Sequence, residues 1–362
     1  MNIEQNDEPK WCWQSNSNPF LYTERPEWRE YPSAVNEQIE KAFQSGEREV
    51  IINDQYLICF EDNLQINLHD STKKRPVERC LLSEEIKKSS RRERFINGDT
   101  PEQFIPGFMN DDIRGHGDRF IREWVRIFGR RERSEIVDAA VYGIITEGTK
   151  EKQLRATKLY VYHLLSVRNQ SMDRIQECCV RLYTHAHFLY RIVNKALREN
   201  DETKLSTLGP FCYLLYNFTR KRIDPTIAKR ESFSRLDKIV NRLRSDERII
   251  HVYRGEPAEN INVFKRMIDN GRYKWSQFIS TSKIRKVAAD FAGRGGCLLV
   301  IQAEYRTLID RGVDISSLSE FPYEEEVLLR PGVQFEVTGS EYDRVNDNMI
   351  FYVRILPSYL AF

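Results

Sequence analysis

Three consecutive glutamates, residues 324 to 326, stand at the entry of an apolar run in the stretch YEEEVLLRPG. A strand places alternate side chains on opposite faces, so this pattern predicts Glu324 and Glu326 on one face and Glu325 on the other. At a rise of about 3.3 Å per residue, two same-face carboxylates begin roughly 6 to 7 Å apart. Like charges this close in a partly desolvated cleft discourage simultaneous ionisation, so one carboxylate can act as a base. A solvated strand end is the alternative interpretation.

Two upstream stretches carry groups suited to binding a phosphorylated ligand. In HVYRG, Arg254 ends an apolar run and Gly255 follows it, so a guanidinium lies beside backbone that a ligand can approach closely. In FISTS, alternation sends Ser280 and Ser282 to the same side, where hydroxyls can bridge a ligand and a carboxylate. The structural alternatives are a strand that ends in a turn with a surface arginine, and a serine that caps the helix of KIRKVAADFAG.

Short strands must position these groups. From residue 249 onward, apolar runs alternate with glycine and polar clusters in IIHVYRG, KWSQFIST, GCLLVIQAEY, EEEVLLRPGVQFEVTGSEY and NMIFYVRILP. Helix-like stretches lie at residues 260 to 270 and 284 to 292, and residues 173 to 200 repeat their apolar positions every three or four residues. Helices followed by mostly antiparallel strands predict an α+β domain.

The order strand-Arg-Gly, strand-Ser-Thr-Ser and Glu-x-Glu-Val-Leu-Leu resembles the arginine-serine-glutamate class of mono-ADP-ribosyltransferases. The likeness covers residues 173 to 362, and it includes YTHAHFLYRIVNKALREN, ADFA and DISSLSEFPYEEEVLLRPGVQFEV. The last stretch is similar to the family's substrate-recognition turn and catalytic strand. The resemblance implies an ADP-ribosyltransferase fold, with helices followed by a mostly antiparallel split β-core. It also implies NAD as the co-substrate, with NADP as an alternative and no metal.

The resemblance implies a role in NAD binding for four residues. Arg254 would hold the diphosphate or the nicotinamide ribose, and Gly255 would offer its backbone to the carboxamide. Ser280 would support the ribose and orient the catalytic carboxylate. Phe291 would stack on the nicotinamide side of the ligand.

The resemblance also divides the work between the two same-face glutamates. Glu326 would bind the ribose and stabilise the oxocarbenium-like charge that develops as nicotinamide leaves. Glu324 would hold the acceptor guanidinium and help to remove its proton, which implies arginine on a target protein as the acceptor. Tyr323, at the end of the preceding turn, would contact that target protein.

The first eighty residues have a different character, with many aromatic residues and strand-like alternation. NEQIEKAFQSG, residues 36 to 46, is the one expected helix, so we predict a small α+β unit built on a curved antiparallel sheet. The order PKWCWQ, EWREY, IEKAF, YLICFEDNLQINL and KKRPVERC resembles the WWE domain, with Trp11 or Trp13, Trp28 and Glu40 as the name-giving residues.

Many WWE domains bind the iso-ADP-ribose unit of poly-ADP-ribose. Matched to that pocket, four residues would line it here: Trp13, Tyr56, Gln65 and Arg75. Aromatic rings stack on adenine, and a guanidinium suits a phosphate. A WWE domain that serves only structure or protein interaction is the alternative.

Composition limits the possible partners and compartments. A formal net charge of +2 gives no global attraction to nucleic acid, so we expect no specific nucleic-acid partner. The start MNIEQNDEPK has no apolar core of a signal peptide, and no apolar run reaches the length of about 18 residues that a membrane span needs. The seven cysteines are odd in number and form no CxxC pair. We therefore expect a cytoplasmic or nuclear protein with reduced thiols.

The chain divides into three expected parts. Residues 1 to 82 form the WWE domain, residues 83 to 172 a helical linker or extension, and residues 173 to 362 the catalytic domain. The charge run RRER within the middle part is typical of a solvated helix face. GHG at 115 to 117 predicts a loop. GRGG at 293 to 296 lacks phosphate-binding spacing and predicts a turn. The histidines and cysteines show no metal-ligand spacing.

The sequence thus predicts an intracellular mono-ADP-ribosyltransferase that transfers ADP-ribose from NAD to arginine on proteins. Its WWE module would bind poly-ADP-ribose, ADP-ribosylated proteins or a partner protein. Two alternatives stay open: an NAD glycohydrolase that hands the ribose to water, and a non-catalytic scaffold that binds ADP-ribose through its WWE domain.

Overall fold

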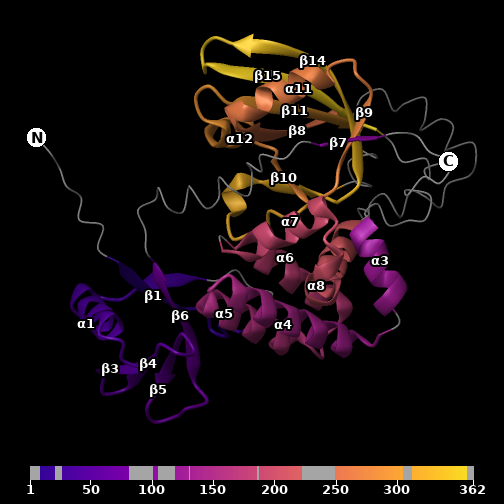
Figure 1. The fold of residues 1–362 in the computed structure, drawn as a ribbon. Helices are drawn as coiled ribbons and strands as arrows, with labels where there is room; N and C mark the ends of the chain where they lie inside the picture. The colour runs from indigo at the N-terminus through magenta and orange to yellow at the C-terminus, as the bar shows by residue number, and fades with distance from the viewer. Residues whose placement is uncertain are drawn as a thin grey trace, which may run out of the picture.

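The computed structural model describes residues 9–20, 27–80, 101–104, 119–129, 131–185, 187–221, 249–304 and 312–356. The RRER run at 91 to 94 and the GHG stretch at 115 to 117 lie outside these residues. Figure 1 shows an N-terminal sheet (indigo), a block of helices (magenta) and a C-terminal sheet (orange to yellow), with the helices between the two sheets. No helix of the described part is both long and apolar enough to cross a membrane.

The N-terminal part is a six-stranded antiparallel sheet with one helix, as the sequence predicts. Its strand order is β2-β1-β6-β5-β4-β3. The elements are β1 (Lys10–Gln14), β2 (Trp28–Glu30), α1 (Ser33–Gln44), β3 (Glu49–Asn53), β4 (Tyr56–Cys59), β5 (Leu64–Asn67) and β6 (Lys74–Cys80). The helix begins three residues before the predicted start, directly after Pro32, whose fixed φ suits a helix entry.

A buried polar cluster joins α1 to the sheet. Glu40 Oε2 accepts hydrogen bonds from Trp11 Nε1 at 2.9 Å and from Arg79 Nε at 2.7 Å, and Glu40 Oε1 accepts one from Gln44 Nε2 at 2.8 Å. The hydrogen bonds from Arg79 are the largest cause that lowers the pKa of Glu40 from 4.5 to about 2, against the opposing effect of burial. The ionised carboxylate is therefore part of the native structure.

We expect this sheet to lose stability as the pH falls from about 4.5 to about 2. Because the pKa of Glu40 is lower in the folded than in the unfolded chain, its contribution is complete above the unfolded value and is lost as the pH approaches the folded one. Denaturation midpoints followed by tryptophan fluorescence across this window test the expectation. Glu40→Gln should show a shallower pH dependence, and an equally steep one would contradict the assignment.

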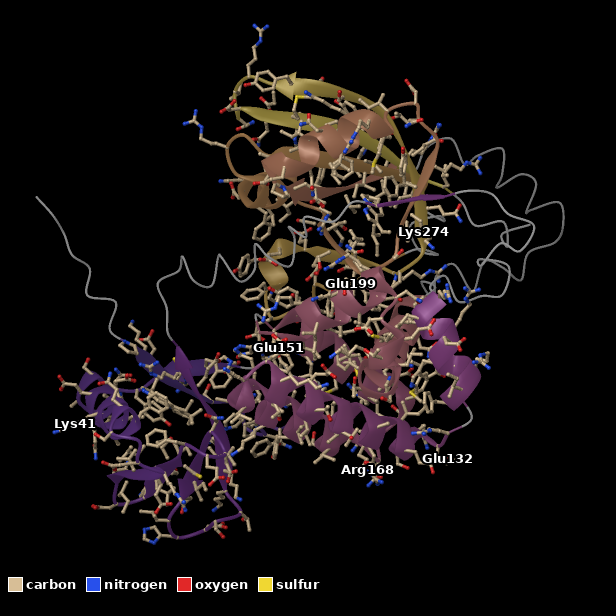
Figure 2. All side chains as sticks on the ribbon, in the orientation of Figure 1. Lys41, Glu132, Glu151, Arg168, Glu199 and Lys274 are labelled. Atoms are coloured by element: carbon tan, nitrogen blue, oxygen red, sulfur yellow. The ribbon has the colours of Figure 1, made fainter. Side chains whose placement is uncertain are left out.

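The helices of the middle layer share one core. They are α3 (Arg119–Phe128), α4 (Arg133–Lys150), α5 (Leu154–Val167), α6 (Met172–Thr184), α7 (Leu189–Glu199), the 3₁₀ turn η2 (Glu202–Lys204) and α8 (Leu205–Lys221). Helix α8, which contains Pro210, has no counterpart among the predicted elements. Glu132, directly before α4, and Arg168, directly after α5, lie at the outer edge of this layer, as Figure 2 shows.

The helical core continues across the predicted boundary between residues 172 and 173. Buried Trp124 from α3, Tyr160 from α5 and Tyr183 from α6 all belong to the same cluster, which also includes Leu328 of the C-terminal sheet. We therefore propose that helices α3 to α5 form one folding unit with the catalytic domain.

The C-terminal sheet has nine strands in the order β12-β13-β10-β8-β11-β15-β14-β9-β7. The strands are β7 (Glu102–Phe104), β8 (Ile249–Glu256), β9 (Arg272–Trp275), β10 (Ile279–Ser282), β11 (Cys297–Glu304), β12 (Gly312–Asp314), β13 (Glu326–Leu329), β14 (Val333–Asp343) and β15 (Asn348–Ile355). Strand β10 pairs with β8 only at Ser282 and Tyr253, so the sheet is nearly split there. Among the described strands, β11 and β15 form the only parallel pair. This arrangement confirms the predicted α+β class with a mostly antiparallel, split β-core.

Two predicted strands are each divided in the structure. KWSQFIST forms β9 and β10, which pair with β14 and β13 respectively, so its two halves lie in different parts of the sheet. The EEEVLLRPGVQFEVTGSEY run contains the 3₁₀ turn η5 (Pro322–Glu324), then β13, and then β14 after Pro331-Gly332. Apolar periodicity does not reveal these breaks, because residues on both sides of each break are buried.

Short helices flank the sheet where the sequence predicts them. They are η4 (Ala258–Asn260), α11 (Ile261–Met267) and α12 (Arg285–Ala292). The GRGG stretch forms the turn between α12 and β11, as expected. Strand β13 is buried on both faces: Leu328 belongs to the helical core, whereas Val327 and Leu329 belong to the core that also contains Phe264 of α11.

Candidate active site

The Glu-x-Glu stretch is a turn followed by a strand, so the prediction that one strand carries all three glutamates is wrong. Glu324 ends the 3₁₀ turn η5, Glu325 has left-handed backbone angles of φ 44° and ψ 53°, and Glu326 begins β13. Glu324 and Glu326 are 1% and 0% exposed, whereas Glu325 is exposed. The two carboxylates are buried as predicted, but a backbone reversal at Glu325 produces this result. Left-handed angles are costly for a residue other than glycine and often mark functional sites.

Strand β10 places the serine motif beside β13. In the antiparallel register, Ser282 lies opposite Glu326 and Ser280 lies opposite Leu328, so Ser280, Ser282 and Glu326 share one face. Ser280 is 1% exposed, and its Oγ has no hydrogen-bond partner among the described residues. A buried hydroxyl without a protein partner next to a carboxylate is suited to binding a ligand.

The other two hydroxyls of the motif bond to backbone carbonyls of the turn and of β13. Ser282 Oγ donates to the Glu324 carbonyl at 2.6 Å and accepts from the Ile284 amide at 2.9 Å. Thr281 Oγ1 donates to the Val327 carbonyl at 2.7 Å. Helix α12 begins after Ile284 and has no side-chain cap, so the alternative in which Ser282 caps this helix is wrong. Ser282 instead holds the turn that carries Glu324.

Arg254 is buried in an ion pair that reaches the serine strand. Its Nε donates to Glu256 Oε1 at 2.6 Å, and its Nη1 donates to the Ser280 carbonyl at 3.0 Å. Asn260 Nδ2 donates to Glu256 Oε2 at 2.9 Å. The Arg254 side chain is only 1% exposed. The guanidinium thus positions Ser280, while its predicted contact with NAD stays a prediction.

Gly255 is required for packing between β8 and α12. A Cβ atom there would lie 2.3 Å from the Ala288 carbonyl oxygen and 2.5 Å from the Ala292 amide nitrogen. Phe291 is on the same helix, α12, and is 3% exposed. The helix therefore explains why a glycine follows Arg254. The expected roles of Gly255 and Phe291 toward NAD stay predictions.

Sequence reasoning missed Ser319, which lies seven residues before Glu326. Its Oγ is 3.5 Å from Glu326 Oε2, and it accepts a hydrogen bond from the Phe321 amide at 3.1 Å. No spacing rule marks this serine, because the contact depends on how the turn folds back onto β13. The exposed Tyr323 follows in the same turn.

The residues of the site fit NAD as a substrate. The buried Ser280 hydroxyl, which has no partner in the described part of the chain, can bind a ribose hydroxyl, and the buried Glu326 carboxylate on the same face can stabilise positive charge on the sugar. No group of three or more histidine, cysteine or acidic residues within the described ranges has the geometry to hold a metal ion.

In the N-terminal sheet, the structure brings the predicted ADP-ribose residues together. The Arg75 guanidinium carbon lies 5.4 Å from the centre of the Trp13 ring, and Gln65 is directly opposite Arg75 on neighbouring strands. Tyr56 lies on β4, and both Tyr56 and Trp13 pack against the core of this sheet.

Three further residues, which the sequence did not indicate, contact this group. Tyr31 Oη donates to Gln65 Oε1 at 2.7 Å. Arg75 Nη1 donates to the carbonyl oxygens of Gln14 at 3.0 Å and Asn16 at 2.7 Å. These bonds fix the orientation of Gln65 and Arg75, and burial raises the pKa of Tyr31.

Comparison with protein families identifies both parts of the chain. The model of the WWE domain matches residues 9–79, and the model of the NAD:arginine ADP-ribosyltransferase family matches residues 149–352, which is more than half of the chain. Both results agree with the architecture predicted from the sequence. The second match begins upstream of residue 173. No curated protein matches the sequence.

Several solved structures are also similar to the chain. The ADP-ribosyltransferase HopU1 of Pseudomonas syringae is 19% identical, with a TM-score of 0.36, over 55% of this chain and 83% of that one. The type III effector XopAI from Xanthomonas axonopodis is 16% identical, with a TM-score of 0.40, over 68% and 100%. The eukaryotic mono-ADP-ribosyltransferase ART2.2 is 16% identical, with a TM-score of 0.34, over 73% and 95%. These scores are low, so the assignment rests on the family models. The chain belongs to the NAD:arginine ADP-ribosyltransferase family and carries an N-terminal WWE domain.

Proposed function

We propose that the protein transfers a single ADP-ribose unit from NAD or NADP to arginine side chains of target proteins. The observation that carries this proposal is that Glu324 and Glu326 are both buried, and that Glu326 shares a face with Ser280, whose buried hydroxyl has no partner among the described residues. The bond that breaks joins nicotinamide to ribose, and the new bond joins the same ribose carbon to an arginine nitrogen.

Each carboxylate has a separate task in this reaction. Glu326 shares a face with Ser280 and stabilises the positive charge that develops on the ribose. Glu324 lies in the turn beside the exposed Tyr323, where a protein substrate can approach, so it holds the arginine and accepts its proton. The Ser282 hydroxyl bonds β10 to the backbone of Glu324, and the Ser319 hydroxyl contacts the Glu326 carboxylate at the start of β13.

Glu324→Gln is expected to abolish transfer to an arginine analogue while NAD cleavage continues. The amide can still occupy the turn, but it cannot accept a proton, and general-base catalysis contributes about 10²–10⁴-fold. Incubation with NAD labelled in the ADP-ribose part measures both products, because free ADP-ribose and labelled analogue are separable.

The same assay distinguishes the two alternatives. An NAD glycohydrolase would release ADP-ribose without labelling any acceptor, and Glu324→Gln would leave its rate unchanged. A scaffold would cleave no NAD at all. An inert wild-type protein with intact fold, checked by its thermal transition, would contradict the proposal.

We also propose that the WWE domain binds poly-ADP-ribose and directs the enzyme to modified proteins, where the local concentration of the enzyme is then raised. Trp13 is partly buried and lies beside Arg75, so one ring and one guanidinium are available together. An intracellular location in cytoplasm or nucleus, where such polymers would be met, stays a prediction.

Trp13→Ala is expected to weaken polymer binding by about tenfold or more, since stacking of a base on an aromatic ring contributes about 1–3 kcal/mol. Binding of purified poly-ADP-ribose to the full chain provides the measurement. Lys10→Ala is the matched control, because Lys10 lies on the same strand with its side chain exposed in an ion pair with Glu30. Equal losses in both variants would indicate non-specific charge attraction.

A further inference from the structure

A cavity of about 150 Å³ lies between the N-terminal sheet and helices α5 and α6. One wall is the outer face of the sheet, where Pro76 and Glu78 alternate with the core residue Val77. The opposite wall includes Ala156 and His163 of α5. In Figure 1, α5 is the helix of the middle layer that lies nearest to the N-terminal sheet. The cavity therefore depends on both parts of the chain.

Direct contacts hold the two walls together. Lys158 Nζ of α5 donates to the Glu61 carbonyl of the N-terminal sheet at 2.9 Å. The rings of Phe20 and Tyr162 lie 5.1 Å apart, centre to centre. These contacts flank the cavity on the α5 side.

Aromatic and imidazole rings are concentrated around the cavity. His185 and His187 both line it, and their rings are nearly parallel, with an interplanar angle of 10° and centres 6.2 Å apart. Trp28 and His163 also contribute to the lining. Burial lowers the pKa of His163 to about 3 and that of His187 to about 4, so both imidazoles are neutral at neutral pH and can each donate and accept one hydrogen bond.

Arg181 supplies a donor that the described residues do not satisfy. It lines the cavity, and its Nε is buried without a hydrogen-bond partner in the described part of the chain. Leaving such a donor unsatisfied costs about 1–3 kcal/mol, and more for a charged group. A ligand that brings an acceptor to Arg181 would recover this free energy.

The charges around the cavity select the class of ligand. Four charged side chains line it, Glu78, Glu320, Arg181 and Arg79, and Arg79 forms an ion pair with Glu40. Two carboxylates disfavour a free anion, and they can accept hydrogen bonds from an amide or amine. Flat rings in the wall favour a flat ligand, and a cavity of about this volume accepts a single ring of benzene size.

We propose that this cavity binds a neutral, planar heteroaromatic ring that carries an amide or amine group, the chemical class of nicotinamide and adenine. The carbonyl or ring nitrogen accepts from Arg181, the amino group donates to a carboxylate, and the ring lies among the imidazoles. The site is separate from the carboxylates Glu324 and Glu326, so it goes beyond the proposed transfer reaction.

An occupant of the cavity would reach the catalytic turn through Glu320. This residue lies four positions before Glu324; its amide donates to Thr184 Oγ1 at 3.1 Å, and its carboxylate is 3.8 Å from His185 Nε2. A ring that contacts Glu320 and His185 stabilises the contacts that Glu320 makes with α6 and His185. The cavity thus links the WWE domain to the turn and is suited to an effector that adjusts the acceptor step.

Calorimetric titration of the full chain with nicotinamide and, separately, with adenine tests the proposal. We expect at least one of the two ring compounds to bind. This binding should be lost in Ala156→Phe, which fills the cavity, and about tenfold weaker in Arg181→Met, which removes the donor. Phe291→Leu, at the residue expected to stack on nicotinamide in the catalytic site, should leave this binding unchanged, which separates the two sites. The two titrations show whether the cavity accepts nicotinamide, adenine or both.

Leu154→Phe is the matched control, because it adds the same ring to an exposed position of α5. If Ala156→Phe does not fold, as its thermal transition will show, Arg181→Met decides the result. Absence of binding at millimolar ligand, binding that survives in both cavity variants, or binding of inorganic phosphate in place of the rings would each overturn the proposal.

Discussion

Glu326→Gln is expected to abolish both NAD cleavage and arginine transfer, with a fall in rate of at least about 10²–10³. The carboxylate is 0% exposed and shares a face with Ser280, so its charge acts on the ribose with little screening by solvent. The amide is nearly the same size but carries no charge. The labelled-NAD assay described above measures both activities, and the loss of both distinguishes Glu326 from Glu324.

Glu325→Gln provides the matched control for this experiment. It is the same substitution at the neighbouring residue, whose side chain is exposed and whose backbone reverses the chain. We expect transfer and cleavage to stay near the wild-type rates. If Glu325→Gln loses activity as fully as Glu326→Gln, then the assignment of the three glutamates is wrong.

Arg254→Met should lower the free energy of unfolding by about 3–5 kcal/mol, a large share of the stability of a typical domain. The substitution removes the guanidinium that neutralises the buried Glu256 carboxylate and that donates to the Ser280 carbonyl. Thermal or denaturant unfolding of the full chain measures the loss. The serine strand should also become less well positioned, so activity falls together with stability.

Two further variants separate stability from substrate binding. Arg354→Met breaks an exposed ion pair with Glu336 on the same sheet and should change stability by at most about 1 kcal/mol. Replacing both partners, as Arg254→Met with Glu256→Leu, should recover most of the stability, because a buried ion pair often contributes no more than apolar residues of similar size. If the double variant regains activity as well, Arg254 makes no essential contact with NAD.

The sequence predicted the architecture well because its patterns are local. The helix at 36 to 46, the alternation around β4 and the helices near 260 to 270 and 284 to 292 all depend on residues close in the chain. The divided strands were missed for the same reason. Nothing local shows that β9 and β10, separated by residues 276 to 278, pair with strands at different places in the sheet.

The motifs around Arg254, Ser280, Glu324 and Glu326 indicate from local sequence which residue types are available for the chemistry and in which order. The burial of both Glu324 and Glu326 depends on the folded chain. The left-handed backbone of Glu325 turns the chain between Glu324 and Glu326, and the hydroxyl of Ser282 holds that turn. Such contacts depend on the register between strands and on folded turns. A periodic pattern specifies which face is buried, but it does not specify which distant residues meet there.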